Sequence, residues 1–82
     1  MYRAKVTITL RKSILDPQGK AIQHALDSLE LKQVEEVRMG KFIEMNINVS
    51  EEKRAKEIAE LACKKLLANT VMEDYSYSVE KI

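Results

Sequence analysis

The sequence contains few of the residues that build covalent cross-links, metal centres or stacking surfaces. It has one cysteine, one proline, two glycines, one phenylalanine and no tryptophan. A single cysteine, Cys63, excludes an internal disulfide and a cysteine-based metal site. The only histidine, His24, leaves carboxylates as the remaining candidate ligands, and no loop carries them at calcium-binding spacing. We therefore expect this chain to bind no metal and no cofactor.

An excess of charge of one sign and a long hydrophobic run are also absent. Fourteen Lys and Arg residues against 13 Asp and Glu residues leave a formal net charge of +1, which argues against the basic surface of an electrostatic nucleic-acid binder. The apolar runs are too short to span a membrane. Residues 1–5 lead directly into an alternating strand pattern, so we expect no signal peptide and a cytoplasmic location.

The length of 82 residues predicts one small domain, residues 1–82. A chain of this size buries roughly 60–65% of the surface that its unfolded form exposes. That is enough for a core, whereas a deep pocket with a complete catalytic set is much harder to fit. We therefore expect the function to come from surfaces, loops or assembly.

The first half of the chain predicts a strand followed by a helix. Apolar and polar residues alternate strictly over Tyr2–Arg11, as in a strand with one face on a core. Asp16 is a good N-cap and Pro17 suits the first helical position, so we predict a helix from Pro17 to about Leu31. Its expected apolar face consists of Ala21, Ile22, Ala25, Leu26 and Leu29.

The residues from Val34 to Val49 predict a β-hairpin. A two-residue loop at its tip would place Val37 on the opposite face from the apolar positions of the second strand, because a one-residue slip reverses every side chain. A three-residue loop over residues 39–41 instead places Val37 opposite Ile43. We therefore predict this loop, with Gly40 at positive φ and a bulge beside it.

A second helix and a last strand complete the expected elements. Ser50 is the predicted N-cap, followed by acidic residues in the first turn, and Asn69 is a plausible left-handed terminator. The expected apolar face consists of Ala55, Ile58, Ala59, Ala62 and Leu66, with Cys63 beside it. Residues 75–80 alternate and predict the final strand.

This element order predicts an α+β fold, a ferredoxin-like βαββαβ sandwich. Its four-stranded antiparallel sheet would carry both helices on one face. The other face would be polar apart from Phe42, so it lacks the paired aromatics with which RNA-recognition motifs stack bases. We expect that face to meet water or another sheet.

The residues with catalytic potential do not form a set. His24 is expected on the solvent side of the first helix, and Cys63 on the core flank of the second, with no base beside it. Gln18 and Gly19 lie in the first turn of a helix, where anions can bind, but Asp16 would occupy the same donors and repel a phosphate. We expect no catalytic residue in this chain.

Three stretches together resemble the PurS family, the small subunit of phosphoribosylformylglycinamidine (FGAM) synthase. They read LDPQGKAIQHAL, VEEVRMGKFIEM and KLLANTVMEDYSY. The sequence departs from the family pattern at Thr70, where proline is common.

The resemblance implies a role in de novo purine biosynthesis. The complex converts formylglycinamide ribonucleotide, glutamine and ATP to FGAM. A large synthetase subunit uses ATP and magnesium, and a glutaminase subunit releases ammonia. The small subunit is a homodimer or a dimer of dimers and a non-catalytic adaptor that joins the other two.

Partner contacts are expected at three exposed turns under this interpretation. The candidate residues are Asp16, Pro17, Gln18 and Gly19 at the helix start, Arg38, Gly40 and Lys41 at the hairpin tip, and Asn69, Glu73 and Asp74 before the last strand. The alternative is an ACT-like regulatory homodimer that binds a small effector, which shares the same element order. An acylphosphatase would share the fold too, but the glycine-rich anion loop with its arginine is missing.

Overall fold

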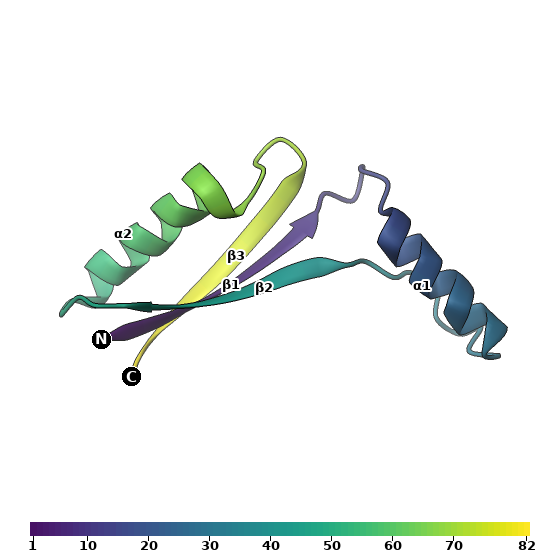
Figure 1. Cartoon of the computed structure of the whole chain (residues 1–82), viewed down its shortest axis with the longest axis horizontal. Coiled ribbons are helices and arrows are strands. Elements are labelled where there is room, and N and C mark those ends of the chain that lie inside the picture. The colour runs from purple at the N-terminus through teal and green to yellow at the C-terminus, as the bar shows by residue number, and fades with distance from the viewer.

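The computed structural model describes residues 1–82 as an antiparallel sheet with two helices and one π-helical turn. In chain order the elements are β1 (Tyr2–Leu10), α1 (Pro17–Ser28), β2 (Gly40–Ile47), α2 (Glu52–Ala62), η1 (Cys63–Leu67) and β3 (Glu73–Lys81). The strand order is β2-β1-β3 (Figure 1). The α+β class is confirmed, but the sheet has three strands, so the prediction of four is wrong.

The alternating segment at the N-terminus forms the central strand. Ala4, Val6 and Ile8 of β1 are fully buried, because β1 is paired on both edges and its apolar face lies on the core. Val6 lies opposite Ile43 on β2 and Tyr77 on β3. The strict alternation of β1 therefore sets the inner and outer faces of the whole sheet.

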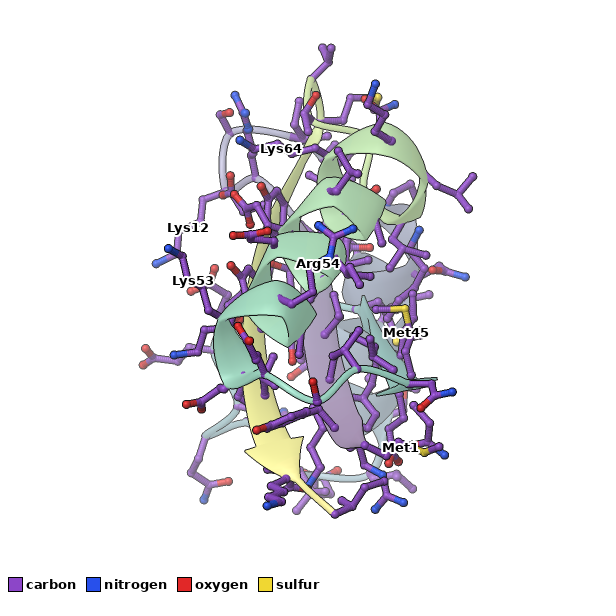
Figure 2. The ribbon with its side chains drawn as sticks, turned by 90° about the vertical axis from the view of Figure 1, so that its left-hand side faces the viewer. Met1, Lys12, Met45, Lys53, Arg54 and Lys64 are labelled. Carbon is purple, nitrogen blue, oxygen red and sulfur yellow. The ribbon has the colours of Figure 1, made fainter.

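Helix α2 covers β1 and β3. Alanines on its inner face permit a close approach, and Ala55 and Ala59 are completely buried against the sheet. Figure 2 shows α2 in front of the sheet, with Lys53, Arg54 and Lys64 on its outer side. The helix begins one residue later than predicted, with Glu51 rather than Ser50 at the N-cap.

The π-helical turn η1 changes which leucine faces the core. The Ala68 N–H donates to the Cys63 carbonyl at 3.0 Å, an i→i+5 bond that adds one residue to the turn. Leu66, predicted on the inner face, is therefore 82% exposed. Leu67 packs against the core in its place.

Asn69 does not end this helix in the left-handed conformation, which is a further correction. Glu30, beyond the end of α1, is the one non-glycine residue with a positive φ, at 64°. Asn69 instead accepts the Val71 N–H on its side-chain oxygen at 3.1 Å, which forms a local turn.

The outer face of the sheet is polar, as predicted, and its charges are paired across strands. Arg3 lies 3.7 Å from Glu44 and Lys5 lies 3.1 Å from Glu80. Phe42 is 60% exposed on this face. Neither helix is long and apolar enough to cross a bilayer.

Helix α1 lies beyond the end of the sheet. We call residues 11–39, which contain α1 and the segments on either side of it, the arm. Figure 1 shows the arm projecting from the end where β1 stops, away from α2. The chain measures 50 × 27 × 14 Å, and its radius of gyration is 16.2 Å, against about 12 Å for a compact domain of this length. The helix ends at Ser28, three residues before the predicted Leu31.

The predicted β-hairpin is not formed, so the predictions of its three-residue loop and of its strand pairing are both wrong. Residues 34–39 are not in a strand, and no glycine has a positive φ. Gly40 is the first residue of β2 and lies opposite Thr9 of β1, so the chain does not turn back at this point. Val37 consequently remains in the arm and does not pair with Ile43 within the chain.

The register change at η1 is tested by a matched pair of substitutions. We expect Leu67→Ala to lower the free energy of unfolding by about 1–2 kcal/mol, because a half-buried side chain loses its core contacts. We expect Leu66→Ala to change it by less than about 0.5 kcal/mol. Urea denaturation measures both, and equal effects would show that Leu66 also packs inward.

Candidate functional site

The residues predicted to contact partners gather at one end of the sheet. Thr9 lies opposite Gly40 on one side and Asp74 on the other. Leu10 lies opposite Glu73. Three segments that are far apart in the sequence therefore meet where β1 ends and the arm begins.

Asp16 connects the start of α1 to the residue that precedes β2. Its side chain is almost completely buried, with 3% exposed. One carboxylate oxygen accepts the Gly19 N–H at 2.9 Å, which confirms Asp16 as the N-cap. The other accepts the Met39 N–H at 2.7 Å. Asp16 is thus occupied inside the chain and is not exposed to a partner.

Charge and hydrogen bonding both keep Asp16 ionised. The bond from Gly19 and then the bond from Met39 lower the pKa of this carboxyl below its usual value of 3.8, and the nearby Arg38 guanidinium lowers it further. Bonds from backbone N–H groups to a carboxylate are charge-assisted and therefore strong. The contact is worth most when the carboxyl is deprotonated.

Arg38 binds the backbone where β1 continues into the arm. Its guanidinium donates to the Leu10 carbonyl at 3.1 Å and the Arg11 carbonyl at 2.7 Å, with longer contacts of 3.4 Å to the Ile14 carbonyl. These carbonyls belong to the last residue of β1 and to the segment that follows it. We call Asp16, Arg38 and the backbone groups that they bind the joint, because they fix the direction in which the arm leaves the sheet.

The arm is held together along its own length. A Cβ on Gly19 would lie 2.3 Å from the Val37 carbonyl oxygen, so only glycine permits this contact. Gln23 donates to the Glu35 carbonyl at 2.8 Å. Sequence reasoning selected Gly19 as a partner contact, whereas in the structure it lies against the arm's own backbone. It missed Gln23, since no local pattern signals a bond to a carbonyl so far along the chain.

A second cluster lies beside the joint at the start of β3. The Glu73 carboxylate lies 3.5 Å from the Lys41 ammonium and accepts the Asn69 N–H at 2.8 Å. Arg11 pairs with Asp74 at 3.3 Å. Among the predicted contact residues of this end, the exposed ones are Pro17, Gln18, Gly40, Lys41, Asn69 and Asp74.

The two residues with catalytic potential lie on different elements, His24 on α1 and Cys63 on η1. His24 is exposed on α1 in a shallow hollow with Asp27, Ser28 and Lys32. Cys63 is completely buried, and burial raises the pKa of its thiol, with Glu60 adding to the effect. A raised pKa disfavours the thiolate, which is the nucleophilic form.

The remaining polar cluster lies between α2 and β3, and Glu60 connects it to a groove beside α2. The Tyr75 hydroxyl donates to Glu60 at 3.1 Å, and Lys64 lies 3.5 Å from the same carboxylate. Burial raises the pKa values of Tyr75 and Tyr77, and Glu60 raises them further. The groove encloses about 450 Å³ and is lined by both signs of charge. No three His, Cys, Asp or Glu side chains group closely enough to hold a metal ion.

Together the fold and the joint define a small α+β assembly module. Its buried polar groups bind its own backbone, while the apolar side chains of its projecting helix are uncovered. The family model of PurS, described as phosphoribosylformylglycinamidine (FGAM) synthase, matches residues 3–81. The chain belongs to the PurS family, the small subunit of FGAM synthase in purine biosynthesis.

Relatives resemble this chain over its whole length. The FGAM synthase subunit PurS of Bacillus subtilis is 49% identical over all of this chain and 96% of its own length. The subunit from Methanocaldococcus jannaschii is 46% identical, and its solved structure matches with a TM-score of 0.89 over 100% of this chain and 99% of that one. Because the match includes the arm, the open shape is shared with this relative.

Relatives of lower identity keep the same shape. A chain in the solved structure of PurLQS from Thermotoga maritima is 28% identical and matches with a TM-score of 0.88 over 96% of each chain. The fold is therefore retained in a chain that belongs to a multi-subunit assembly.

The joint makes the arm sensitive to acid. The lowered pKa of Asp16 means that its contribution is complete above the usual carboxyl pKa and is lost as the pH falls through the folded value, below about pH 4. We expect the amide resonances of Gly19 and Met39 to titrate together in this range by NMR.

Substitution of Asp16 tests whether its carboxylate holds the joint together. We expect Asp16→Ala to accelerate hydrogen exchange of the Gly19 and Met39 amides at least tenfold at pH 7, with the exchange of β1 amides unchanged. Asp27→Ala, on the exposed side of α1, is the matched control and leaves both amides protected. Protection that survived in Asp16→Ala would contradict the assignment of the joint.

Proposed function

We propose that this chain is a non-catalytic adaptor that joins the synthetase and glutaminase subunits of FGAM synthase. The observation that carries the proposal is the match to a chain of the PurLQS structure over 96% of each chain. Two features support the absence of catalysis: Cys63 is buried with a raised pKa and His24 lies in open solvent. The polar groups of the joint are engaged by the chain's own backbone.

The adaptor would act by arranging its partners. The complex would convert formylglycinamide ribonucleotide to FGAM, with ammonia released from glutamine by one subunit and consumed by the other. Holding the two active sites in a fixed relation raises the effective concentration of ammonia and limits its loss to water. ATP and magnesium would be used by the synthetase subunit, and this chain would bind no cofactor.

The partner surface would lie at the end of the sheet beside the joint. Exposed side chains at the starts of two strands, Lys41 of β2 and Asp74 of β3, are held there by ion pairs. A surface whose side chains are already ordered loses less conformational entropy on binding. The proposal also includes self-association of the small subunit, as a homodimer or a dimer of dimers.

The adaptor role is tested by turnover. We expect the purified chain alone to release no ammonia from glutamine and to form no FGAM, and its addition to the synthetase and glutaminase subunits to raise glutamine-dependent FGAM formation at least tenfold. Turnover by the isolated chain would overturn the proposal. A thermal shift of the isolated chain specific to one amino acid or nucleotide would instead favour the effector-binding regulator.

The position of the partner surface is tested by two charge reversals on β3. Asp74 pairs with Arg11 at the end beside the joint, and Glu80 pairs with Lys5 at the opposite end of the same face. Exposed pairs like these contribute about 0–1 kcal/mol to stability, so both variants should fold. We expect Asp74→Lys to weaken capture of the partner subunits at least tenfold and Glu80→Lys to weaken it less than twofold. The reverse ranking would place the surface at the other end.

A further inference from the structure

β3 is an edge strand whose outer side pairs with no other strand. The strand order β2-β1-β3 leaves one edge of this nine-residue strand free. Natural proteins usually block such an edge with a proline, a bulge, a charged side chain or a covering segment. β3 contains no proline, pairs with β1 without a bulge, and has its only lysine at its last position. Its middle, residues 75–79, is uncharged, so this edge is open to an added strand.

Backbone bonds at both ends of the sheet show which groups of β3 face the free edge. The Ile82 N–H donates to the Met1 carbonyl at 3.1 Å, and the Arg11 N–H donates to the Met72 carbonyl at 2.9 Å. Residues of an antiparallel strand alternate between bonding to one neighbour and facing away from it, so the even-numbered residues of β3 bond to β1. The residues of its middle that direct their N–H and carbonyl groups outward are therefore Tyr75, Tyr77 and Val79. No strand lies beyond β3 to bind these groups.

The groove beside α2 reaches this edge at Tyr77. Tyr77 is the one residue of β3 that lines it, and the other lining residues all belong to α2. Figure 2 shows Lys53, which lines the groove, and Met45 of β2 on opposite sides of α2. Successive side chains of a strand point to opposite faces. A strand added to β3 would therefore direct alternate side chains toward the groove.

The groove has one positive charge that lacks a partner. Each of its three glutamates forms an ion pair with a nearby cation: Glu52 with Lys56, Glu57 with Arg54, and Glu60 with Lys64. Lys53 is exposed and forms no ion pair. Among incoming side chains, an aspartate or a glutamate therefore complements the charge of this groove.

We propose that the free edge of β3 binds an extended segment of a partner subunit by strand addition. The segment pairs with the backbone of residues 75–79 and places an acidic side chain in the groove beside Lys53. Ser76 and Ser78 are small and lie on the outer face, where they leave room for larger side chains of the segment. The inference rests on the proposed adaptor role, because a chain that joins two proteins needs a surface for each. This edge extends along the side of the sheet, away from the end beside the joint.

A second copy of this chain complements the edge less well than such a segment. Antiparallel pairing of β3 with itself, centred on Tyr77, places Asp74 opposite Glu80 at two positions. Like charges directly opposite each other are destabilising. A second β3 also brings no free acid to the groove, because the one acid on its inner face is Glu73, which is already paired with Lys41.

Strand addition is tested by hydrogen exchange at single-residue resolution. The full-length chain is measured alone and with the synthetase or the glutaminase subunit added separately. We expect the amides of Tyr75, Tyr77 and Val79 to exchange at least tenfold more slowly when the subunit that supplies the segment is bound. The amides of Ser76 and Ser78 already bond to β1, so they exchange slowly in both states and serve as the internal control. This alternation distinguishes strand addition from the burial of side chains alone.

The acidic contact is tested by two charge reversals. Lys53 lies in the groove, whereas Lys65 of η1 lies outside it. Both are exposed and form no ion pair, so both variants should fold, as judged by circular dichroism. We expect Lys53→Glu to weaken capture of the bound subunit at least fivefold and Lys65→Glu to weaken it less than twofold. Equal effects would overturn the assignment of the groove.

Two results of the exchange experiment would overturn the proposal. Slow exchange of the outward-facing amides in the isolated chain, increasing with its concentration, would show that a second copy occupies the edge. Rapid exchange in the presence of either subunit, with capture intact, would show that the edge stays free, and the adaptor role would still be judged by turnover. A chain that captured neither subunit would overturn the adaptor role and this inference together.

Discussion

The shape of this protein depends on one buried carboxylate. Asp16 accepts the N–H groups of Gly19 and Met39, which are 20 residues apart in the sequence, on its two oxygens. Arg38 then binds the carbonyls of Leu10, the last residue of β1, and Arg11, the residue after it. The bonds to Asp16 are charge-assisted, and this residue is almost completely buried, so they are stronger than a surface pair. They point the arm away from the sheet and leave its apolar helix uncovered.

The outward direction of the arm has two consequences. The core belongs to β1, α2 and η1, where Val6, Ile8, Ala59 and Cys63 are completely buried, while α1 contributes nothing to it. The end of the sheet beside the joint becomes an ordered surface made from three segments that are distant in the sequence. A small chain can thus present a rigid contact surface without a deep pocket, which is consistent with membership of the PurS family and with the adaptor role that we propose.

The predicted site and the observed one share residues but differ in what those residues do. Asp16, Gly19 and Arg38 were selected as partner contacts because they lie in turns and at a helix start. In the structure they bind the chain's own backbone, and the exposed positions are neighbours such as Pro17, Lys41 and Asp74. Local sequence identifies a turn, but it does not identify which backbone group the turn will meet.

By itself the sequence determined the elements whose signals are local. These are the alternation of β1, the cap at Asp16 with Pro17 after it, the alanine face of α2 and the polar outer face of the sheet. Only the tertiary structure decided where the arm points, that residues 39–41 do not turn, and that η1 rotates Leu66 outward. The physical reason is that a closed hairpin and an open arm satisfy the same local preferences, and the choice between them depends on bonds such as Asp16 to Met39 that join distant residues.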